Sequence, residues 1–548
     1  MTRSALNDET FDFVIVGGGS AGCVLAARLS ADSGNRVLLL EAGGRDDSRL
    51  MPMPLACGSI FYDPALNWSL ASEPEVFADD RIIHPAAGRV LGGGSSINGM
   101  IYTRGHRLDY DQWAQMGCRG WSFDDVLPSF TRAECNWRGA SKIHGDSGPL
   151  TTSPLARDAM FVAIADTARR AGLRVTDDFE RDGPDGFGLP DITTHGGRRA
   201  STARRYVHQV RRRKNLVVKT DVCVTRIVME RSIAVGVEYA EGANTKQVGA
   251  RREVILSAGA YGSPKLLLLS GIGPADDVAS VGITPVVDLP SVGKNLQEHP
   301  GTALTFGTKD PMQFDRELRL DRLISSVARW WLTGTGPVST LPISAMAFIR
   351  TRQELERPDI ELLFTPSALN ARTWFPGWRK SSGATLAISA FLMRPASRGS
   401  VCLRSPDPRA PPRIHLNLLG EPEDRTTLLA AMRMVREFMA GEPVASLVAG
   451  ELGPGREFTS DEALLSYLRR TIRTMQHPTS TCAMGIGDDA VTDPELRVRG
   501  TERLRVVDAS VMPQIVGGHT NAPTIMIAEK AADMILGRLE SAENHEAA

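Results

Sequence analysis

The chain of 548 residues balances 63 Lys and Arg against 64 Asp and Glu, for a formal net charge of −1. This balance gives no electrostatic reason to expect nucleic acid as a partner, and we interpret the arginine-rich stretch 198–213 as a solvated surface. No run approaches the roughly 18 apolar residues of a membrane span, and the opening stretch MTRSALNDET lacks the apolar segment of a secretion signal. The seven scattered cysteines show no metal-like spacing. We therefore expect a cytoplasmic enzyme with no integral membrane segment, no nucleic-acid partner and no metal site.

Residues 11–44 read FDFVIVGGGSAGCVLAARLSADSGNRVLLLEAGG and predict a strand, a glycine-rich turn, a helix and a second strand. Gly17, Gly19 and Gly22 fit the pattern G-x-G-x-x-G. Its first glycine allows a tight turn, its second lets the backbone approach a pyrophosphate, and its third brings helix against strand. N–H groups at the start of the helix suit that pyrophosphate. Glu41 ends the second strand with a carboxylate that suits a ribose diol, so the unit predicts an adenine dinucleotide as ligand.

The same glycines offer an alternative, because Gly18-x-Ser20-x-Gly22 is the pattern of a hydrolase nucleophile elbow. That fold needs earlier strands to build its sheet and its oxyanion loop, whereas only about ten residues precede the first strand here. Position in the chain therefore favours the dinucleotide site.

Further elements follow in chain order. After a loop-rich stretch at 51–85, a second glycine cluster at 88–102 reads GRVLGGGSSINGMIY and indicates close approach of backbone to a flat or crowded group. Strands are predicted at 215–220, 222–229, 233–239 and 253–257. The stretch 259–273 then turns into a helix that is expected to start near Pro264. From about residue 301, strand-like runs at 343–349, 360–364, 385–393 and 400–403 mix with helices. A buried-type strand at 504–508 and a helix at 521–539, with Pro523 in its first turn, close the chain.

These elements predict a mixed α/β fold with two domains. The first is a discontinuous, Rossmann-like nucleotide-binding domain built from residues 1–150, 200–300 and 475–540. The second is a substrate-binding domain, residues 151–199 and 301–474, with a mostly antiparallel sheet flanked by helices.

Five ordered motifs now resemble the glucose–methanol–choline oxidoreductases, flavoproteins that oxidise alcohols with FAD. The motifs are GRVLGGGSSING at 88–99, GAYGSP through SGIG at 259–273, HPTSTCAMG at 477–485, VDASVMP at 507–513 and NAPT at 521–524. The closing segment is most similar to the bacterial choline-dehydrogenase-like branch. Two positions depart from that branch: Ser480 replaces a common glycine, and His519 stands where choline-type members usually carry Asn. Some aryl-alcohol and sugar oxidases carry His there, which argues against choline as the substrate.

The resemblance implies an FAD site and two catalytic histidines, His477 and His519. Some relatives attach the flavin through a histidine near the end of the glycine-serine cluster, but Ser95-Ser96-Ile97-Asn98 contains none, so we expect non-covalent FAD. The expected cofactor-binding residues are Gly17, Gly19, Ser20, Gly22, Glu41, Ala42, Arg89, Gly92, Gly93, Ser96, Asn98, Gly99, Met100, Val224, Asp508, Ala509, Asn521, Pro523 and Thr524.

The predicted activity is oxidation of a non-sugar alcohol, with primary alcohols favoured. His477 is expected to take the hydroxyl proton, since an imidazole titrates near neutral pH, while a hydride goes to flavin N5. His519 is expected beside the substrate oxygen, before a helix whose N-terminus favours negative charge on the flavin. O2, a quinone or another acceptor then reoxidises the flavin. The alternatives are a hydroxynitrile lyase of the same fold and a flavin photodecarboxylase, while the alcohol and the oligomeric state stay open.

Overall fold

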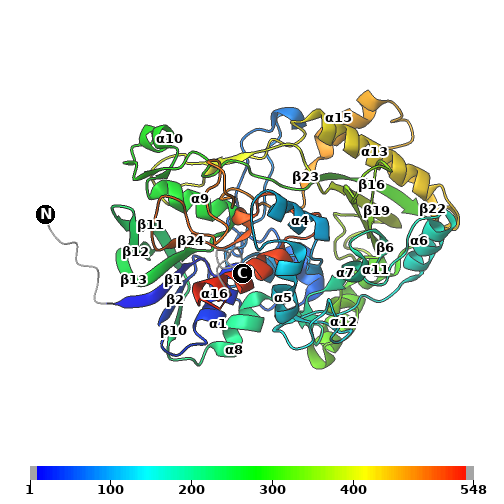
Figure 1. Cartoon of the computed structure of the whole chain (residues 1–548). Helices are drawn as coiled ribbons and strands as arrows, with labels where there is room; N and C mark the ends of the chain where they lie inside the picture. Colours follow the sequence, from blue (N-terminus) through cyan, green and yellow to red (C-terminus); the bar gives the residue numbers. More distant parts are fainter. Residues whose placement is uncertain (1–8, 539–548) are drawn as a thin grey trace.

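The computed structural model describes residues 9–538 and contains two large sheets with helices packed around them (Figure 1). The first sheet has the order β10-β2-β1-β13-β12-β11, and β24 pairs with β13. Its strands are β1 (Thr10–Val16), β2 (Val37–Leu40), β10 (Leu216–Lys219), β11 (Val222–Glu230), β12 (Ile233–Glu241), β13 (Asn244–Leu256) and β24 (Leu504–Val506). The pairs from β10 to β13, and β13 with β24, are parallel, whereas β11 and β12 form an antiparallel edge.

The predicted strand–helix–strand unit is confirmed. β1 and β2 pair in parallel register from Phe13–Val37 to Val16–Leu40, and every residue of β2 is buried. Helix α1 (Ser20–Leu29) between them is made almost wholly of small and apolar buried residues. It packs against α16 (Asn521–Ile535), which comes from the far end of the chain, so the nucleotide-binding fold is discontinuous as expected (Figure 1).

The second sheet is antiparallel throughout, with the order β22-β16-β19-β18-β17-β6 and β23 beside β16. Its strands are β6 (Gly186–Gly188), β16 (Pro300–Thr308), β17 (Ala345–Ile349), β18 (Ile360–Thr365), β19 (Thr385–Leu392), β22 (Val448–Gly453) and β23 (Arg473–Thr474). Helices α6 (Ala159–Arg170), α13 (Pro422–Met439) and α15 (Asp461–Thr471) pack against it at the end of the molecule away from the first sheet (Figure 1).

The two faces of this second sheet serve different purposes. Because side chains alternate along a strand, Ile388 and Ala390 of β19 join the apolar core that also contains residues of α13. Ser389 and Phe391 lie on the opposite face and line a cavity. The alternating side chains of β19 therefore pack into the core on one face of the sheet and line the cavity on the other.

Some predicted elements differ in extent. Helix α9 (Gly259–Leu269) was expected to start near Pro264 but begins at Gly259. This proline therefore lies inside the helix rather than near its first position. The run at 400–403 forms β20 (Ser400–Cys402), which among residues 9–538 pairs with β21 (Arg413–His415) rather than with the large sheet. Helix α16 ends at Ile535, and Leu539, the predicted end, lies outside the described residues.

The remaining elements include short strand pairs and further helices. The strand pairs are β3 (Ile101–Tyr102) with β7 (Asp191–Ile192), β4 (Glu134–Cys135) with β5 (Leu150–Thr151), β8 (Thr194–His195) with β9 (Arg198–Arg199), and β14 (Ile272–Gly273) with β15 (Val287–Asp288). The helices are α2 (Cys57–Ile60), α3 (Gly94–Ile97), α4 (Arg107–Gln115), α5 (Phe123–Ala133), α7 (Phe179–Asp182), α8 (His208–Val210), α10 (Ala275–Ser280), α11 (Gln313–Glu317), α12 (Leu320–Thr333) and α14 (Val444–Leu447). None of the helices between residues 9 and 538 is long and apolar enough to cross a membrane. The domain boundaries given above stay a prediction.

Candidate active site

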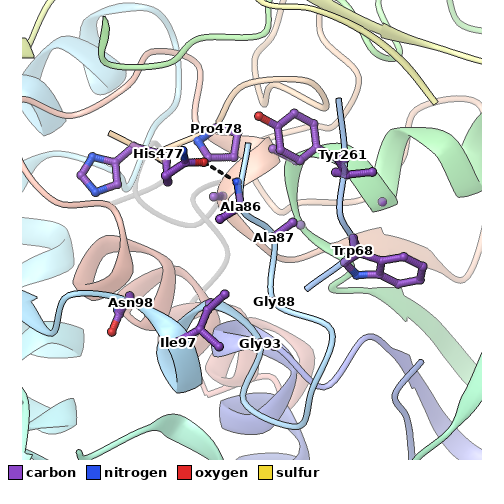
Figure 2. A pocket seen from close by; sticks show the side chains of 18 of the residues that line it. Trp68, Ala86, Ala87, Gly88, Gly93, Ile97, Asn98, Tyr261, His477 and Pro478 are labelled. Carbon is purple, nitrogen blue, oxygen red and sulfur yellow. Dashed lines mark hydrogen bonds between the residues drawn. The ribbon is translucent and has the colours of Figure 1, made fainter. Parts of the chain in front are cut away.

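One cavity of about 970 Å³ reaches from the glycine-rich turn after β1 to the cavity face of the second sheet. Figure 2 shows His477 and Pro478 on one side, Tyr261 and Trp68 on another, and Gly93, Ile97 and Asn98 along a third wall. Residues far apart in the sequence therefore line one continuous space.

The glycines of the first turn act as the pattern predicts. Gly17 has a φ of +100°, and a Cβ there would lie 2.4 Å from the carbonyl oxygen of Ser257. A Cβ on Gly22 would lie 1.9 Å from the carbonyl oxygen of Gly17, so only glycine lets helix and turn meet. The nearest atom to a Cβ built on Gly19 would be the carbonyl oxygen of Ser257, at 3.8 Å. Gly19 also lines the cavity, so its backbone is open to a ligand.

Glu41 lies at the end of β2 with its carboxylate held between two loops. Oε2 accepts the N–H of Gly18 and Oε1 accepts the N–H of Gly43, both at 2.7 Å. Burial raises the pKa of Glu41 to about 7, although the two backbone donors favour the ionised form. The carboxylate lines the cavity and each oxygen keeps a lone pair, which suits the hydroxyls of a ribose.

The second glycine cluster packs directly on the first. A Cβ on Gly93 would lie 2.7 Å from Cα of Gly19, so the two backbones touch. Arg199 donates to the carbonyl oxygen of Asn98 at 2.7 Å and to its Oδ1 at 2.9 Å, which fixes Asn98 at the cavity wall. Arg199 is only 2% exposed, so the interpretation of the stretch 198–213 as a solvated surface is wrong for this residue. Arg199 donates to backbone carbonyls that are distant in the sequence, and the charge pattern around Arg199 does not predict such contacts.

Most of the predicted cofactor-binding residues meet at this cavity. Those that line it are Gly17, Gly19, Ser20, Glu41, Ala42, Gly93, Asn98, Gly99, Met100, Val224, Asp508, Ala509, Asn521 and Thr524. Both predicted catalytic histidines, His477 and His519, line it as well.

The other predicted cofactor residues do not line the cavity and support it instead. Gly92 turns the chain with a φ of +90°, and Ser96 is fully buried with its hydroxyl donating to the carbonyl oxygen of Leu91 at 2.8 Å. Arg89 is exposed, with its guanidinium 5.1 Å from the centre of the Trp68 ring.

Gly22 and Pro523 likewise serve the two helices that end at the cavity. Gly22 packs α1 on the turn, and Pro523 is buried in the first turn of α16. Ser20 donates to Asn521 Oδ1 at 2.8 Å, which joins the N-termini of α1 and α16. Two helix N-termini thus face the same cavity, and both favour negative charge there.

His477 and His519 form the reactive end of the cavity. Their rings meet edge to face, with centroids 4.9 Å apart. A third histidine, His299, places its Nδ1 3.1 Å from Nδ1 of His477. No described residue hydrogen-bonds Nε2 of His477, so this nitrogen is left for a substrate.

Glu298 holds the two segments that carry these histidines. Its Oε1 accepts the backbone N–H of His477 at 2.6 Å and that of His299 at 3.0 Å. The pKa of Glu298 rises to about 8 because the carboxyl is buried. The backbones of Gln297 and Thr479 also hydrogen-bond to each other, which further joins the segments that carry His299 and His477.

Glu361 orients His519 from the second sheet. Its Oε1 lies 3.1 Å from Nε2 of His519, and the backbone N–H of His519 donates to Thr103 Oγ1 at 2.9 Å. Glu361 is fully buried, and its Oε2 has no hydrogen-bond partner among the described residues.

Two imidazoles at this end, those of His477 and His299, are favoured in the neutral form. Burial, followed by the charges of His519 and His299, lowers the pKa of His477 well below its usual 6.5. The pKa of His299 falls to about 3, first because of burial and then because of His519. A neutral His477 has a lone pair with which to accept a proton at neutral pH.

Comparison with known proteins identifies the family. Sequence profiles of the GMC oxidoreductases match residues 11–301 and 395–528. An oxygen-dependent choline dehydrogenase from Photobacterium profundum is 39% identical over 97% of this chain and 94% of its own length. The mitochondrial choline dehydrogenase of Mus musculus is also 39% identical, over 97% of this chain and 91% of its own.

Solved structures agree. Pyridoxine 4-oxidase from Mesorbium loti has a TM-score of 0.87 at 30% identity, covering 97% of this chain and all of its own. A formate oxidase variant from Aspergillus oryzae has a TM-score of 0.89 at 29% identity, covering 97% and 99%. The chain belongs to the GMC oxidoreductase family. It is therefore an FAD-dependent oxidoreductase acting on alcohols, and the cavity fits that cofactor because it joins a dinucleotide turn to two helix N-termini and a histidine pair.

Several residues of the site escaped sequence reasoning. His299 precedes Pro300 as His477 precedes Pro478, and this repeated His-Pro pair was the available signal. Glu361 is a charged residue inside the apolar strand IELLF, which could have marked it as a buried functional carboxylate. Glu298 carries no local signal.

Proposed function

We propose that the enzyme oxidises a primary, non-sugar alcohol to the aldehyde, with His477 as general base. The observation that carries this proposal is the histidine pair at one end of a cavity whose other end is the dinucleotide turn. When bound, FAD supplies the acceptor for the hydride, at N5 of its flavin ring. The removed proton needs a base within the same space, and Nε2 of His477 is suited to take it.

His519 is proposed to position the substrate hydroxyl and to share its proton. Since Nε2 of His519 faces Glu361, its Nδ1 is the nitrogen left for the substrate. Nδ1 accepts a hydrogen bond when the ring is neutral and donates one when the ring is protonated. Glu361 fixes the ring in the orientation that makes this possible, as a carboxylate does for other catalytic histidines.

The hydroxynitrile-lyase alternative is not supported, since the relatives described above are named as dehydrogenases and oxidases. We propose that O2, a quinone or another acceptor reoxidises the flavin, and the name of the Photobacterium relative supports O2.

The test is to mix the oxidised holoenzyme with primary alcohols without oxygen and then admit air. Bleaching of the flavin supports alcohol oxidation, and its absence with every alcohol contradicts it. Rapid return of the colour with peroxide marks an oxidase, whereas slow return marks a dehydrogenase that uses another acceptor.

A further inference from the structure

Arg473 is a second charged group on the cavity face of the second sheet, close in sequence to the catalytic histidine. Arg473 lies on β23 and pairs with Gly301 of β16. In the same register row, Gly301 pairs with Phe391 of β19, and Phe391 pairs with Glu361 of β18. Residues in one register row share a face of the sheet, so Arg473, Phe391 and Glu361 point the same way. Arg473 and Phe391 both line the cavity, and Glu361 binds His519 there.

Gly301, which lies between Arg473 and Phe391 in this row, leaves room for contact between their side chains. Gly301 has no side chain, and a Cβ there would lie 2.4 Å from the ring of Phe391. The ring therefore covers Gly301 and reaches Arg473, whose guanidinium lies 5.3 Å from the ring centre. This contact holds the guanidinium in a defined place.

The guanidinium of Arg473 has unused hydrogen-bonding capacity. Its Nη2 donates to Ser389 Oγ at 2.5 Å, but its buried Nε has no hydrogen-bond partner within the described part of the chain. No carboxylate of residues 9–538 forms an ion pair with it. Burial lowers the pKa of Arg473, yet an arginine stays protonated in proteins, so a positive charge is left without a counter-ion at the cavity wall.

The other arginines of this cavity differ from Arg473. Arg81 donates to the backbone carbonyls of Arg469 and Ile472, and Arg409 pairs with Asp407. Elsewhere the partly buried Arg436 is satisfied by Glu451. Arg199 is more deeply buried and is held by carbonyl oxygens without a carboxylate, whereas Arg473 lines the cavity with its Nε unpartnered. A ligand in the cavity that pairs with Arg473 would offset the cost of partly removing this cation from water.

That ligand is not the cofactor pyrophosphate, because the dinucleotide turn lies on the first sheet and Arg473 on the second. We propose that the alcohol substrate carries a carboxylate and that Arg473 binds it, a proposal that rests on the function proposed above. The cavity is also lined by the apolar side chains Phe61, Leu363, Leu369 and Phe391, of which Phe391 contacts Arg473, and this lining suits a hydrocarbon body between carboxylate and hydroxyl. Arg473 and Glu361 are three strand spacings apart, about 14 Å between their backbones, so the two polar ends are held well apart.

This assignment makes choline a poor substrate. Choline has no carboxylate to pair with Arg473, and its positive charge is of the same sign as the guanidinium at the far end of the cavity. A hydroxy acid with a hydrocarbon spacer would instead make bidentate hydrogen bonds to the planar guanidinium.

The first test measures binding without turnover. Oxidised holoenzyme is titrated with straight-chain carboxylates that lack a hydroxyl, and the change in flavin absorbance gives the Kd. We expect Arg473→Gln to weaken binding by about 10- to 100-fold, Arg473→Lys to weaken it less, and the exposed Arg322→Gln control to change nothing. Equal Kd values in wild type and Arg473→Gln would overturn the proposal.

The second test compares substrates by anaerobic flavin reduction, using ω-hydroxy acids of increasing length, neutral primary alcohols of the same length, and choline. In the wild type we expect hydroxy acids to have the highest kcat/KM, and in Arg473→Gln we expect a loss for hydroxy acids alone. A wild type that prefers neutral alcohols or choline would overturn the proposal even if Arg473→Gln does not fold. If no alcohol reduces the flavin, the proposed function fails, while the carboxylate titration still decides the role of Arg473.

Discussion

Glu361 Oε1 lies 3.1 Å from Nε2 of His519, so a buried carboxylate from the second sheet orients a histidine that precedes a helix of the first domain. The contact joins the two halves of the site. It also distinguishes the two ring nitrogens, since Nε2 faces Glu361 and Nδ1 is the nitrogen that we propose for the substrate.

We predict that His519→Asn retains far more activity than His519→Ala. Asparagine keeps a hydrogen-bonding group beside the substrate oxygen, whereas alanine removes it. The measurement is the rate of anaerobic flavin reduction at saturating alcohol, and equal losses in both variants would count against the positioning role. Glu361→Gln should lower the rate less than His519→Ala, because an amide oxygen still accepts from Nε2.

Glu41 is predicted to hold the adenosine ribose. Glu41→Ala removes a charge-assisted hydrogen bond to the cofactor worth roughly 1.5–3 kcal/mol, so FAD should dissociate more readily. It also leaves the N–H groups of Gly18 and Gly43 without their acceptor. Glu41→Gln keeps an acceptor for one of them and is the matched control. Flavin affinity that is unchanged in Glu41→Ala, measured by dialysis and fluorescence, contradicts the assignment.

The flavin is predicted to be bound without a covalent link. The stretch from Ser95 to Asn98, near which some relatives carry the linking histidine, contains none, although Ile97 and Asn98 line the cavity. Acid precipitation should release all of the yellow colour into the supernatant. Colour that stays with the pellet would refute the prediction.

Glu298 should make the fold less stable as the pH rises. Its pKa is raised from 4.5 to about 8 in the folded protein, so the folded state binds more protons than the unfolded state between these values. Stability contributed by the protonated carboxyl is therefore present below about pH 4.5 and is lost as the pH rises toward 8.

The matched variant for this effect is Glu298→Gln, which cannot ionise but keeps an oxygen for the N–H groups of His477 and His299. Relative to wild type it should gain about 1 kcal/mol or more at pH 8 compared with pH 5, measured by denaturant unfolding of the holoenzyme. Glu298→Ala should be destabilised at both pH values because two buried N–H groups lose their acceptor. A Gln variant with the same pH slope as wild type would show that Glu298 does not cause the change.

The parts of the fold that follow from neighbouring residues were predictable from the sequence. The turn from Gly17 to Gly22 and the strand that ends at Glu41 form one local unit, so periodicity and glycine spacing defined them. His477 and His519 could be singled out because their segments resemble family motifs.

Residues brought in by strand pairing were not predictable in this way. Arg473 lines the cavity, and Glu361 contacts His519 there, because β18, β19, β16 and β23 align in one register. A shift of one residue would turn such side chains to the other face of the sheet. The role of Arg199 was not predictable for the same reason, because its partners are the carbonyls of a loop that is distant in the sequence. Such contacts depend on tertiary structure rather than on local pattern.

In the proposed reaction His477 takes the proton of the alcohol, and the direct test of this role is anaerobic stopped-flow reduction of wild type and His477→Ala across pH. Because burial and the neighbouring histidines lower the pKa of His477, reduction by the wild type should persist below pH 6.5 and fall only in more acidic solution, as the imidazole becomes protonated. A positioned general base contributes roughly 10²–10⁴-fold, so His477→Ala should reduce its flavin more slowly by about that factor while it stays folded and yellow. A variant that keeps its full complement of FAD and is reduced at close to the wild-type rate would contradict the account.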